Sequence, residues 1–170
     1  MPLTAEDLST IQSFRSWLCA EVRRRPEWFG VLSESEPRTA DRDDHSTLAT
    51  RFSAADDTHF EVAIRPGLPA VRVGVATDSR WRNEELEERI EETGDEMEEY
   101  IEQAFADVDL DWVEPPVEHY REQQKWFCFV TPLELVSVSE LGKPATRDKI
   151  LRMLAGYWAG FGKVFAPKPQ

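Results

Sequence analysis

The sequence predicts a single α+β domain over residues 1–170, with an antiparallel sheet of about five strands and helices packed mainly on one face. Two observations predict this class. Apolar residues recur at helical spacing near both ends of the chain and once in between, and the segments that separate these helices alternate between apolar and polar residues. The links between the first alternating segments are short, which favours antiparallel neighbours. The expected order of elements is α-β-β-β-α-β-β-α.

Residues 5–24 are predicted to form the first helix. Thr4 is a candidate cap with Asp7 three residues on, and Pro26 closes the helix after the basic run "RRR" at 23–25. Cations at a helix C-terminus complement the helix dipole, so this run fits a helix end better than a nucleic-acid patch. The apolar stripe of the helix consists of Leu8, Ile11, Phe14, Leu18 and Val22, widened by Trp17.

Three strands are expected next, after a polar stretch at 33–46 that lacks a pattern and is predicted to be a mobile loop. The strands cover residues 47–53, 59–65 and 70–76, and the alternation is cleanest in the last two. The second strand carries Phe60, Val62 and Ile64 on one face and Glu61, Ala63 and Arg65 on the other. One face of the sheet is therefore apolar and the other polar, so we expect helices to cover one face only.

The acidic segment "EELEERIEETGDEMEEYIEQAF" at 84–105 is predicted to be one amphipathic helix of roughly six turns. Gly94 in its middle lowers helix stability by about 1 kcal/mol relative to Ala and is a candidate for a kink. Seven pairs of acidic residues lie four positions apart here, and each pair destabilises a helix by about 0.2–0.5 kcal/mol. The helix is therefore expected to depend on its apolar stripe, which consists of Leu86, Ile90, Thr93, Met97, Ile101 and Phe105.

Two more strands, at 109–114 and 124–130, and a last helix, at about 145–163, complete the predicted domain. The strand at 124–130 is apolar on both faces, so it is either central in the sheet or in contact with another subunit. In the last helix, Gly156 and Gly160 weaken the helix but allow a neighbour to approach closely. We therefore expect this helix to depend on docking against the rest of the domain.

The net charge of −13 is concentrated in one segment. Residues 81–122 hold 17 acidic residues against three arginines, a balance of −14, and the rest of the chain holds 16 acidic residues against 17 basic ones, a balance of +1. Direct nucleic-acid binding needs a basic face and is not expected. The acidic helix is either simply solvated or presents a face to a basic partner. The residues proposed for that face are Glu87, Glu91, Asp95, Glu98 and Glu102.

No pattern in the chain specifies a catalytic, cofactor or metal site. The motifs GxSxG, GxxxxGK[ST], GxGxxG and HExxH do not occur. The three histidines lack metal-ligand spacing and none lies in the acidic helix, so we expect neither a metal nor a cofactor. Cys128 lies between two phenylalanines, where a buried, inert thiol is more expected than a catalytic one.

Aromatic residues are abundant, and some of them are candidates for an exposed dimer or interaction surface. The alternative is a tryptophan-rich core. The residues proposed for such a surface are Trp126, Phe127 and Phe129, which lie on the strand that is apolar on both faces.

The chain is expected to be cytoplasmic. Its N-terminus lacks the basic-then-apolar order of a signal peptide. No run of 18 apolar residues occurs, so no membrane span is expected. Cys19 and Cys128 are expected to be reduced thiols, and a disulfide between them is the alternative. The tail at 166–170 is expected to fray.

The element order, the small size and the acidic pI resemble the type III secretion chaperone-like fold, including the YbjN-type modules. This resemblance implies an α+β domain that forms dimers and binds protein segments. The C-terminal half also resembles an uncharacterised domain attached to putative restriction-endonuclease proteins. The residues that carry this second likeness are "VRVGVA" at 71–76, the acidic helix, "LDW" at 110–112 and "YWAGFGKVF" at 157–165. Neither resemblance implies catalytic residues.

From these observations we expect a non-enzymatic protein-binding module with a chaperone-like or regulatory role, acting as a homodimer. Its partner would be a protein, and a basic one if the acidic helix is the contact face. One alternative is an accessory domain of a defence or DNA-modification system that acts through a protein partner. The other is an enzyme that carries no recognisable motif.

Overall fold

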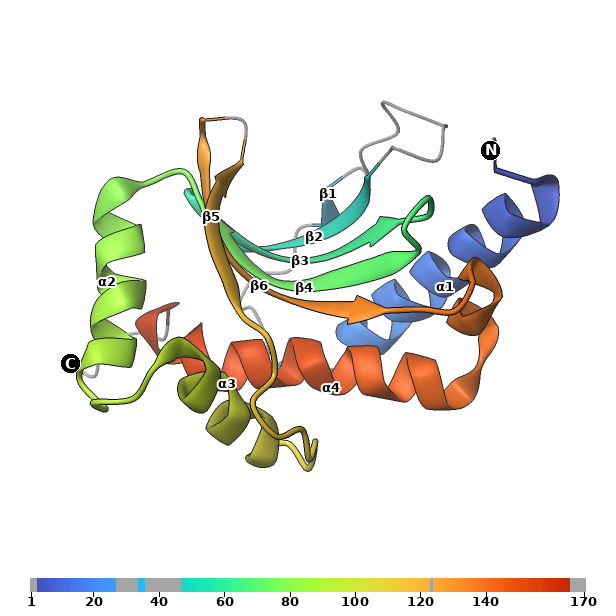
Figure 1. The fold of residues 1–170 in the computed structure, drawn as a ribbon. Coiled ribbons are helices and arrows are strands. Elements are labelled where there is room, and N and C mark those ends of the chain that lie inside the picture. Colours follow the sequence, from blue (N-terminus) through green and yellow to red (C-terminus); the bar gives the residue numbers. More distant parts are fainter. Residues whose placement is uncertain (1–2, 27–33, 36–46, 123, 166–170) are drawn as a thin grey trace.

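The structure is a computed structural model that describes residues 3–26, 34–35, 47–122 and 124–165. It confirms the α+β class and the antiparallel sheet (Figure 1). The sheet has the strand order β1-β2-β3-β4-β6-β5. Its strands are β1 (Glu34–Ser35), β2 (Leu48–Ala55), β3 (Thr58–Arg65), β4 (Ala70–Thr77), β5 (Glu118–Glu122) and β6 (Trp126–Glu134). The helices are α1 (Ala5–Arg23), α2 (Arg80–Glu91), α3 (Met97–Ala106) and α4 (Pro144–Phe161), with 3-10 turns η1 (Val138–Gly142) and η2 (Gly162–Phe165).

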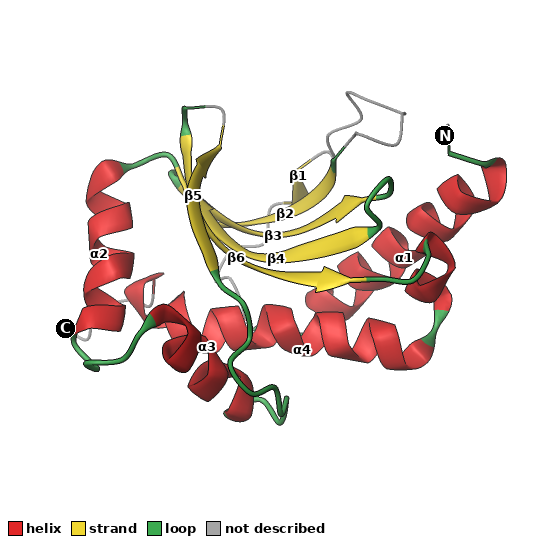
Figure 2. Ribbon diagram, in the orientation of Figure 1, coloured by secondary structure: helices red, strands yellow, loops and turns green. Residues whose placement is uncertain are grey.

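Helices α1, α3 and α4 lie on one side of the sheet, and none of the described helices lies on its other side (Figures 1 and 2). The alternation of β3 explains this arrangement, because Phe60, Val62 and Ile64 are all almost fully buried against the helices. Their partners across the ladder continue the same apolar face, with Val62 opposite Val73 and Val75 opposite Phe129. This apolar face explains why the helices pack mainly on one side of the sheet, as predicted.

Helix α1 begins as the sequence predicts. The Thr4 side chain accepts a hydrogen bond from the Asp7 amide at 3.0 Å, and the Asp7 carboxylate accepts one from the Thr4 amide at 3.3 Å. At the other end, Arg25 donates to the Glu21 carbonyl at 2.7 Å, so the basic run does serve the helix terminus. Leu8 departs from the predicted apolar stripe, since 39% of its surface stays exposed.

The prediction of one six-turn acidic helix is wrong, because the segment forms two helices, α2 and α3. Gly94 lies between them with φ = 76°, a left-handed conformation that glycine adopts without the usual steric cost. Three of the seven like-charge pairs now span this turn instead of lying one helical turn apart: Glu91–Asp95, Glu92–Glu96 and Asp95–Glu99. The chain direction changes, and much of the expected repulsion is relieved.

The predicted strand at 109–114 is also wrong, and the strand that pairs with β6 is β5, a few residues later. Asp109 and Glu114 have positive φ angles of 62° and 47°, which a strand does not tolerate. The aromatic residue in this segment packs elsewhere: the ring of Trp112 lies 6.0 Å from that of Phe105 and 4.1 Å from the Lys149 ammonium. Packing against α3 and α4 therefore replaces strand pairing here.

The close approach predicted for the last helix is confirmed, and the neighbour is α3. A Cβ atom added to Gly156 would collide with the ring of Phe105, and one added to Gly160 would lie 3.2 Å from the ring of Tyr100. The Tyr100 hydroxyl donates a hydrogen bond to the Gly160 carbonyl, which holds the two helices together at this point. The glycines that weaken α4 are thus what allows α3 to dock.

Strand β6 lies inside the sheet, between β4 and β5. This is the first of the two alternatives that its two apolar faces predicted. The backbone of β6 comes unusually close to that of β4 at Gly74. A Cβ atom at Gly74 would collide with the Phe129 carbonyl oxygen and lie 2.7 Å from the Val130 Cα, so the β4–β6 pair has its observed curvature only with glycine here.

Apart from β1, the predicted mobile loop at 33–46 lies outside the described residues, as does the tail at 166–170. Cys19 and Cys128 are free thiols, and Cys128 is buried. None of the described helices combines the length and the apolar character that a membrane crossing requires.

Replacing Gly74 with Ala should destabilise the protein by about 3 kcal/mol, because the added Cβ meets backbone atoms that cannot move aside without breaking the ladder. The matched control is Gly142→Ala, whose Cβ would meet nothing within 4 Å and should change stability by less than about 0.5 kcal/mol. Urea unfolding followed by circular dichroism measures both. Equal stability of the two variants would show that Gly74 does not govern the curvature of the sheet.

Candidate functional site

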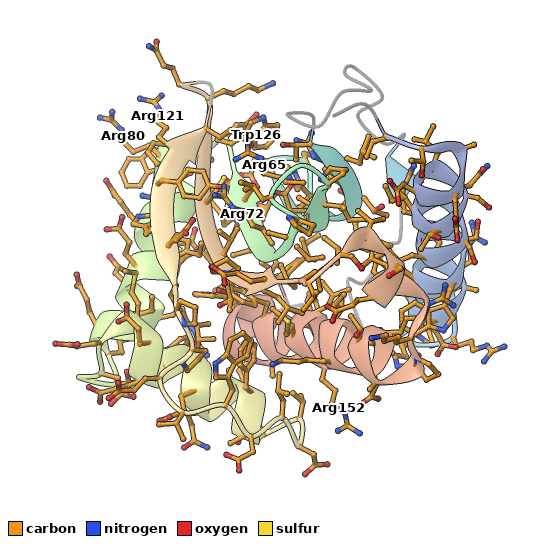
Figure 3. All side chains as sticks on the ribbon, turned by 45° about the vertical axis from the view of Figure 1, so that its right-hand side comes forward. Arg65, Arg72, Arg80, Arg121, Trp126 and Arg152 are labelled. Carbon is orange, nitrogen blue, oxygen red and sulfur yellow. The ribbon has the colours of Figure 1, made fainter. Side chains whose placement is uncertain are left out.

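The side of the sheet without helices is hollow and polar, and we call it the helix-free face. The residues on this face are given by the strand register, and residues paired across neighbouring strands form rows. One row is Ser53, His59, Ala76, Cys128 and Tyr120; the next is Arg51, Glu61, Gly74, Val130 and Glu118; a third contains Ala49, Ala63 and Arg72; Arg65 and Trp126 lie at its two ends. In Figure 3, Arg65, Arg72 and Trp126 gather on this side, and Arg152 lies beyond α4.

Two hollows open on the helix-free face and share Arg51. We call the first the arginine hollow; it has a volume of about 150 Å³ and is lined by Thr47, Ala49, Arg51, Glu61, Ala63, Arg65, Arg72, Tyr120 and Glu122. The second, the tryptophan hollow, has a volume of about 250 Å³ and is lined by Arg51, Ser53, Ala55, Asp56, Thr58, His59 and Trp126. The two hollows adjoin at Arg51, and together we call them the groove.

Glu61 is the buried charge between the two hollows, with 5% of its surface exposed. One of its carboxylate oxygens lies 3.4 Å from the Arg51 Nε and 3.3 Å from the His59 Nε2. Burial by itself raises the pKa of Glu61, but the hydrogen bonds and charges of His59 and Arg51 outweigh it and hold the pKa below its ordinary value of 4.5. Glu61 is therefore an ionised anchor that fixes the Arg51 side chain.

Arg72 and Tyr120 form the opposite wall of the arginine hollow. The Arg72 guanidinium donates to the Tyr120 hydroxyl at 3.2 Å and lies 3.6 Å from a carboxylate oxygen of Glu118. Burial, with a smaller contribution from Cys128, raises the pKa of Tyr120 to about 12. The phenol therefore keeps its proton at neutral pH. Its oxygen accepts from Arg72, which leaves its O–H free to donate to a ligand in the hollow.

Arg65 differs from the other arginines of the arginine hollow. Its Nε atom is buried and has no hydrogen-bond partner among the described residues. No ion pair within that part of the chain involves its guanidinium either, whereas Arg51 and Arg72 each have a carboxylate nearby. A buried guanidinium N–H that remains unpaired is unfavourable, so the position of Arg65 indicates a missing acceptor.

Trp126 forms the wall of the tryptophan hollow. Its ring makes an edge-on contact with His59 at 4.7 Å between centroids, and the Arg51 guanidinium lies 5.5 Å from it. The two phenylalanines predicted beside it lie on the opposite face of β6. Phe129 is only 1% exposed and stacks on His119 at 3.8 Å, so it belongs to the core. Phe127 is half-buried, with Arg121 over its ring. Of the three aromatic residues proposed for an interaction surface, only Trp126 lies on the helix-free face.

The five acidic residues proposed for a basic partner do not share one helix face. Glu87 lies on α2, where its carboxylate is 2.8 Å from the Asn83 amide nitrogen and 3.2 Å from the His119 Nε2. Glu102 lies on α3, where it accepts from the Glu114 amide at 2.7 Å. The other three are Glu91, at the end of α2, Asp95, in the turn, and Glu98, at the start of α3. The turn at Gly94 therefore separates the five acidic residues, which do not form a single face.

A third hollow, of about 350 Å³, lies between α1 and α4, but its cations already have partners. Arg147 donates to the Leu141 carbonyl at 2.7 Å and lies 5.4 Å from the Trp17 ring. Arg25 is bound to Glu21. The helix-free face is therefore the better candidate site.

The side chains of the helix-free face offer mainly hydrogen-bonding and stacking groups. Burial, strengthened by the nearby charges of Glu61 and Glu122, raises the pKa of Cys128 to about 12, so its thiolate is not populated at neutral pH. Within the described part of the chain, no three His, Cys, Asp or Glu side chains come close enough to hold a metal ion. The guanidinium groups, the phenol and the indole are hydrogen-bonding and stacking groups.

Sequence reasoning did not identify the arginine hollow. A usable signal was present, because Arg65 and Glu61 fall on the polar face of a cleanly alternating strand, and Arg72 does so in the next one. The contribution of Tyr120 had no such signal, since the strand that carries it was expected elsewhere.

Comparison with family models, with curated proteins and with solved structures gave no match to this chain. The resemblances to chaperone-like modules and to the endonuclease-associated domain therefore stay predictions, and the site has to be interpreted from its own geometry.

Replacing Glu61 with Gln should destabilise the protein at pH 7 by about 2 kcal/mol, because Arg51 and His59 lose their carboxylate. A carboxyl group whose pKa is lowered by folding contributes stability above its unfolded pKa and loses that contribution as the pH falls through its folded pKa. The difference between wild type and variant should therefore be constant above about pH 5 and shrink below about pH 4.

Urea unfolding at intervals from about pH 7 to about pH 3 measures this difference. Glu134→Gln is the control, since Glu134 is exposed and lies outside both hollows. A Glu61→Gln variant as stable as the control at pH 7 would show that the buried carboxylate is not an anchor.

Proposed function

We propose that this chain is a non-enzymatic protein-binding module with a chaperone-like or regulatory role, and that it holds a polypeptide segment along the helix-free face. The observation that carries the proposal is the groove formed by the arginine hollow and the tryptophan hollow on a sheet face that none of the described helices covers.

The size of the hollows supports a polypeptide over a single small molecule. Sites for drug-sized ligands usually enclose about 300–1,000 Å³, and the two hollows have volumes of only about 150 and 250 Å³. Hollows of this size receive single side chains, and two adjacent ones suit successive side chains of an extended segment. Trp126 at one end supplies the large aromatic surface that binding sites favour.

The same residues argue against the enzymatic alternative. The only described cysteine on the helix-free face has a pKa of about 12, so it supplies no nucleophile. His59 is bound to Glu61, and its ring lies against Trp126. No described serine, threonine or cysteine hydrogen-bonds to it as a nucleophile would to its base. Binding is the activity these contacts favour.

Self-association is the second part of the proposal. Trp81, the second residue of α2, leaves 79% of its surface in solvent, although tryptophan is enriched in protein interfaces. A homodimer that covers Trp81 would leave the helix-free face open for a partner, because α2 stands beside β5 and not over the sheet (Figure 1).

A polypeptide-binding groove predicts that linear peptides can be selected from a random phage-displayed library on the immobilised protein. Their affinity should fall at least about tenfold for Ala63→Phe, whose added ring fills the arginine hollow. It should stay within about twofold for Ala20→Phe, because Ala20 is exposed on α1, on the other side of the sheet. Fluorescence polarisation of the selected peptides measures these affinities, and urea unfolding checks that both variants fold.

Two outcomes would overturn the proposal. One is that the wild-type protein selects no peptides above background. The other is that the selected peptides bind both phenylalanine variants as tightly as the wild type, which would place them away from the helix-free face.

The dimer predicts a solution mass of twice 19.6 kDa by light scattering, and Trp81→Ser should shift the protein to the monomer because an interface aromatic is lost. Val136→Ser is the control, since Val136 is 89% exposed but lies beyond the end of β6, not on α2. A monomeric wild-type protein would refute the self-association and leave peptide binding untouched.

A further inference from the structure

We infer that the arginine hollow is a carboxylate-binding site centred on Arg65, and that an aspartate or glutamate side chain of the bound segment occupies it. This inference rests on the proposed function and names the chemistry of the partner: an acidic polypeptide segment. It differs from the basic partner that was expected if the acidic segment at 84–105 is the contact face.

Among the three arginines of the arginine hollow, only Arg65 has no ion pair with the described chain. Arg51 has Glu61 at 3.4 Å, and Arg72 has Glu118 at 3.6 Å together with the Tyr120 hydroxyl. Arg65 alone has neither a hydrogen bond nor an ion pair with the rest of the described chain, and its Nε atom is buried. One negative charge in the hollow would complete the set.

The donors around the hollow suit a carboxylate. The Arg65 guanidinium presents its N–H groups in a planar fork, the geometry that binds two carboxylate oxygens at once. The Tyr120 hydroxyl, which accepts from Arg72, has its own proton to donate from the opposite wall. Both donors already line the empty hollow, so little reorganisation accompanies binding.

The balance of charge favours a monoanion over a phosphate. Glu61 and Glu122 also line the arginine hollow, so its three guanidinium groups face two carboxylates. A dianionic phosphate would be repelled by both. The arginine hollow, with a volume of about 150 Å³, accommodates a side-chain carboxyl group. The adjacent tryptophan hollow is lined by an aromatic ring and suits an apolar side chain next to it in the segment.

The test uses the full chain labelled with ¹⁵N-arginine and a blocked pentapeptide, acetyl-Gly-Val-Glu-Val-Gly-amide. The side-chain Nε–H signal of Arg65 is the readout, because this buried donor has no partner among the described residues. The signal should move saturably as the peptide is added. The otherwise identical peptide with Gln in place of Glu should bind at least about tenfold more weakly, since charge-assisted hydrogen bonds are lost.

Variants locate the effect. Arg65→Gln should weaken the Glu peptide at least about tenfold, followed on backbone amide signals, and Arg65→Lys should bind with intermediate affinity because it keeps the charge but loses the fork. Arg80→Gln removes the same charge from an exposed position outside both hollows and should change the affinity less than about twofold. Arg65→Gln should unfold no earlier than the wild type, because it removes an unpaired buried group.

Each contrary result overturns the inference. These results are equal affinity for the Glu and Gln peptides, equal weakening by Arg65→Gln and Arg80→Gln, and an Arg65 signal that does not move. Tighter binding of the peptide with phosphoserine in place of Glu, or of inorganic phosphate, would assign the hollow to phosphate instead.

The inference and the proposed function fail separately. If the library yields groove-binding peptides without acidic residues and Arg65→Gln does not affect them, the carboxylate site is wrong and the protein-binding function stands. If the library yields none but the Glu pentapeptide and acetyl-glutamate both move the Arg65 signal equally well, the carboxylate site stands. The ligand is then a small carboxylate, not a polypeptide.

Discussion

The curvature of the sheet at Gly74 is the constraint on which the rest of the structure depends. Strands β4 and β6 pair so closely that no side chain fits between Gly74 and the backbone around Phe129 and Val130. The β5–β6 hairpin can therefore rise beside the helix-free face (Figure 2). A flatter sheet would carry Arg65 and Tyr120 apart, and the hollow they share would open into a plain surface.

A second constraint separates the two charged regions of the molecule. Gly94 turns the acidic segment into two helices, so its carboxylates are distributed over α2, a turn and α3 instead of along one face. The arginines of the central strands lie on the opposite layer, where Glu61 holds one of them by a buried ion pair. The carboxylates of α2 and α3 thus lie apart from the groove, whose charge is set by its own arginines and glutamates.

Local pattern predicted most of the elements. The alternation of β3 and the capping pair Thr4 and Asp7 appear in the structure as expected, because each depends on residues that are neighbours in the sequence. The segment around Trp112 was predicted as a strand and is a loop, because the Trp112 ring packs on Phe105 of the preceding helix and under Lys149 of the distant helix α4. The arginine hollow was missed for a similar reason, since Arg65 and Tyr120 are brought together only by the strand order β3-β4-β6-β5.

The sequence by itself determined the class of the fold, the apolar face of each central strand and the capped start of α1, because side-chain periodicity and capping act over a few residues. Only the tertiary structure decided which polar residues meet on the other face, whether the acidic segment is one helix or two, and which arginine of the arginine hollow lacks an ion pair. These depend on strand order and on packing between distant segments, and they leave the buried Nε of Arg65 without a partner among the described residues.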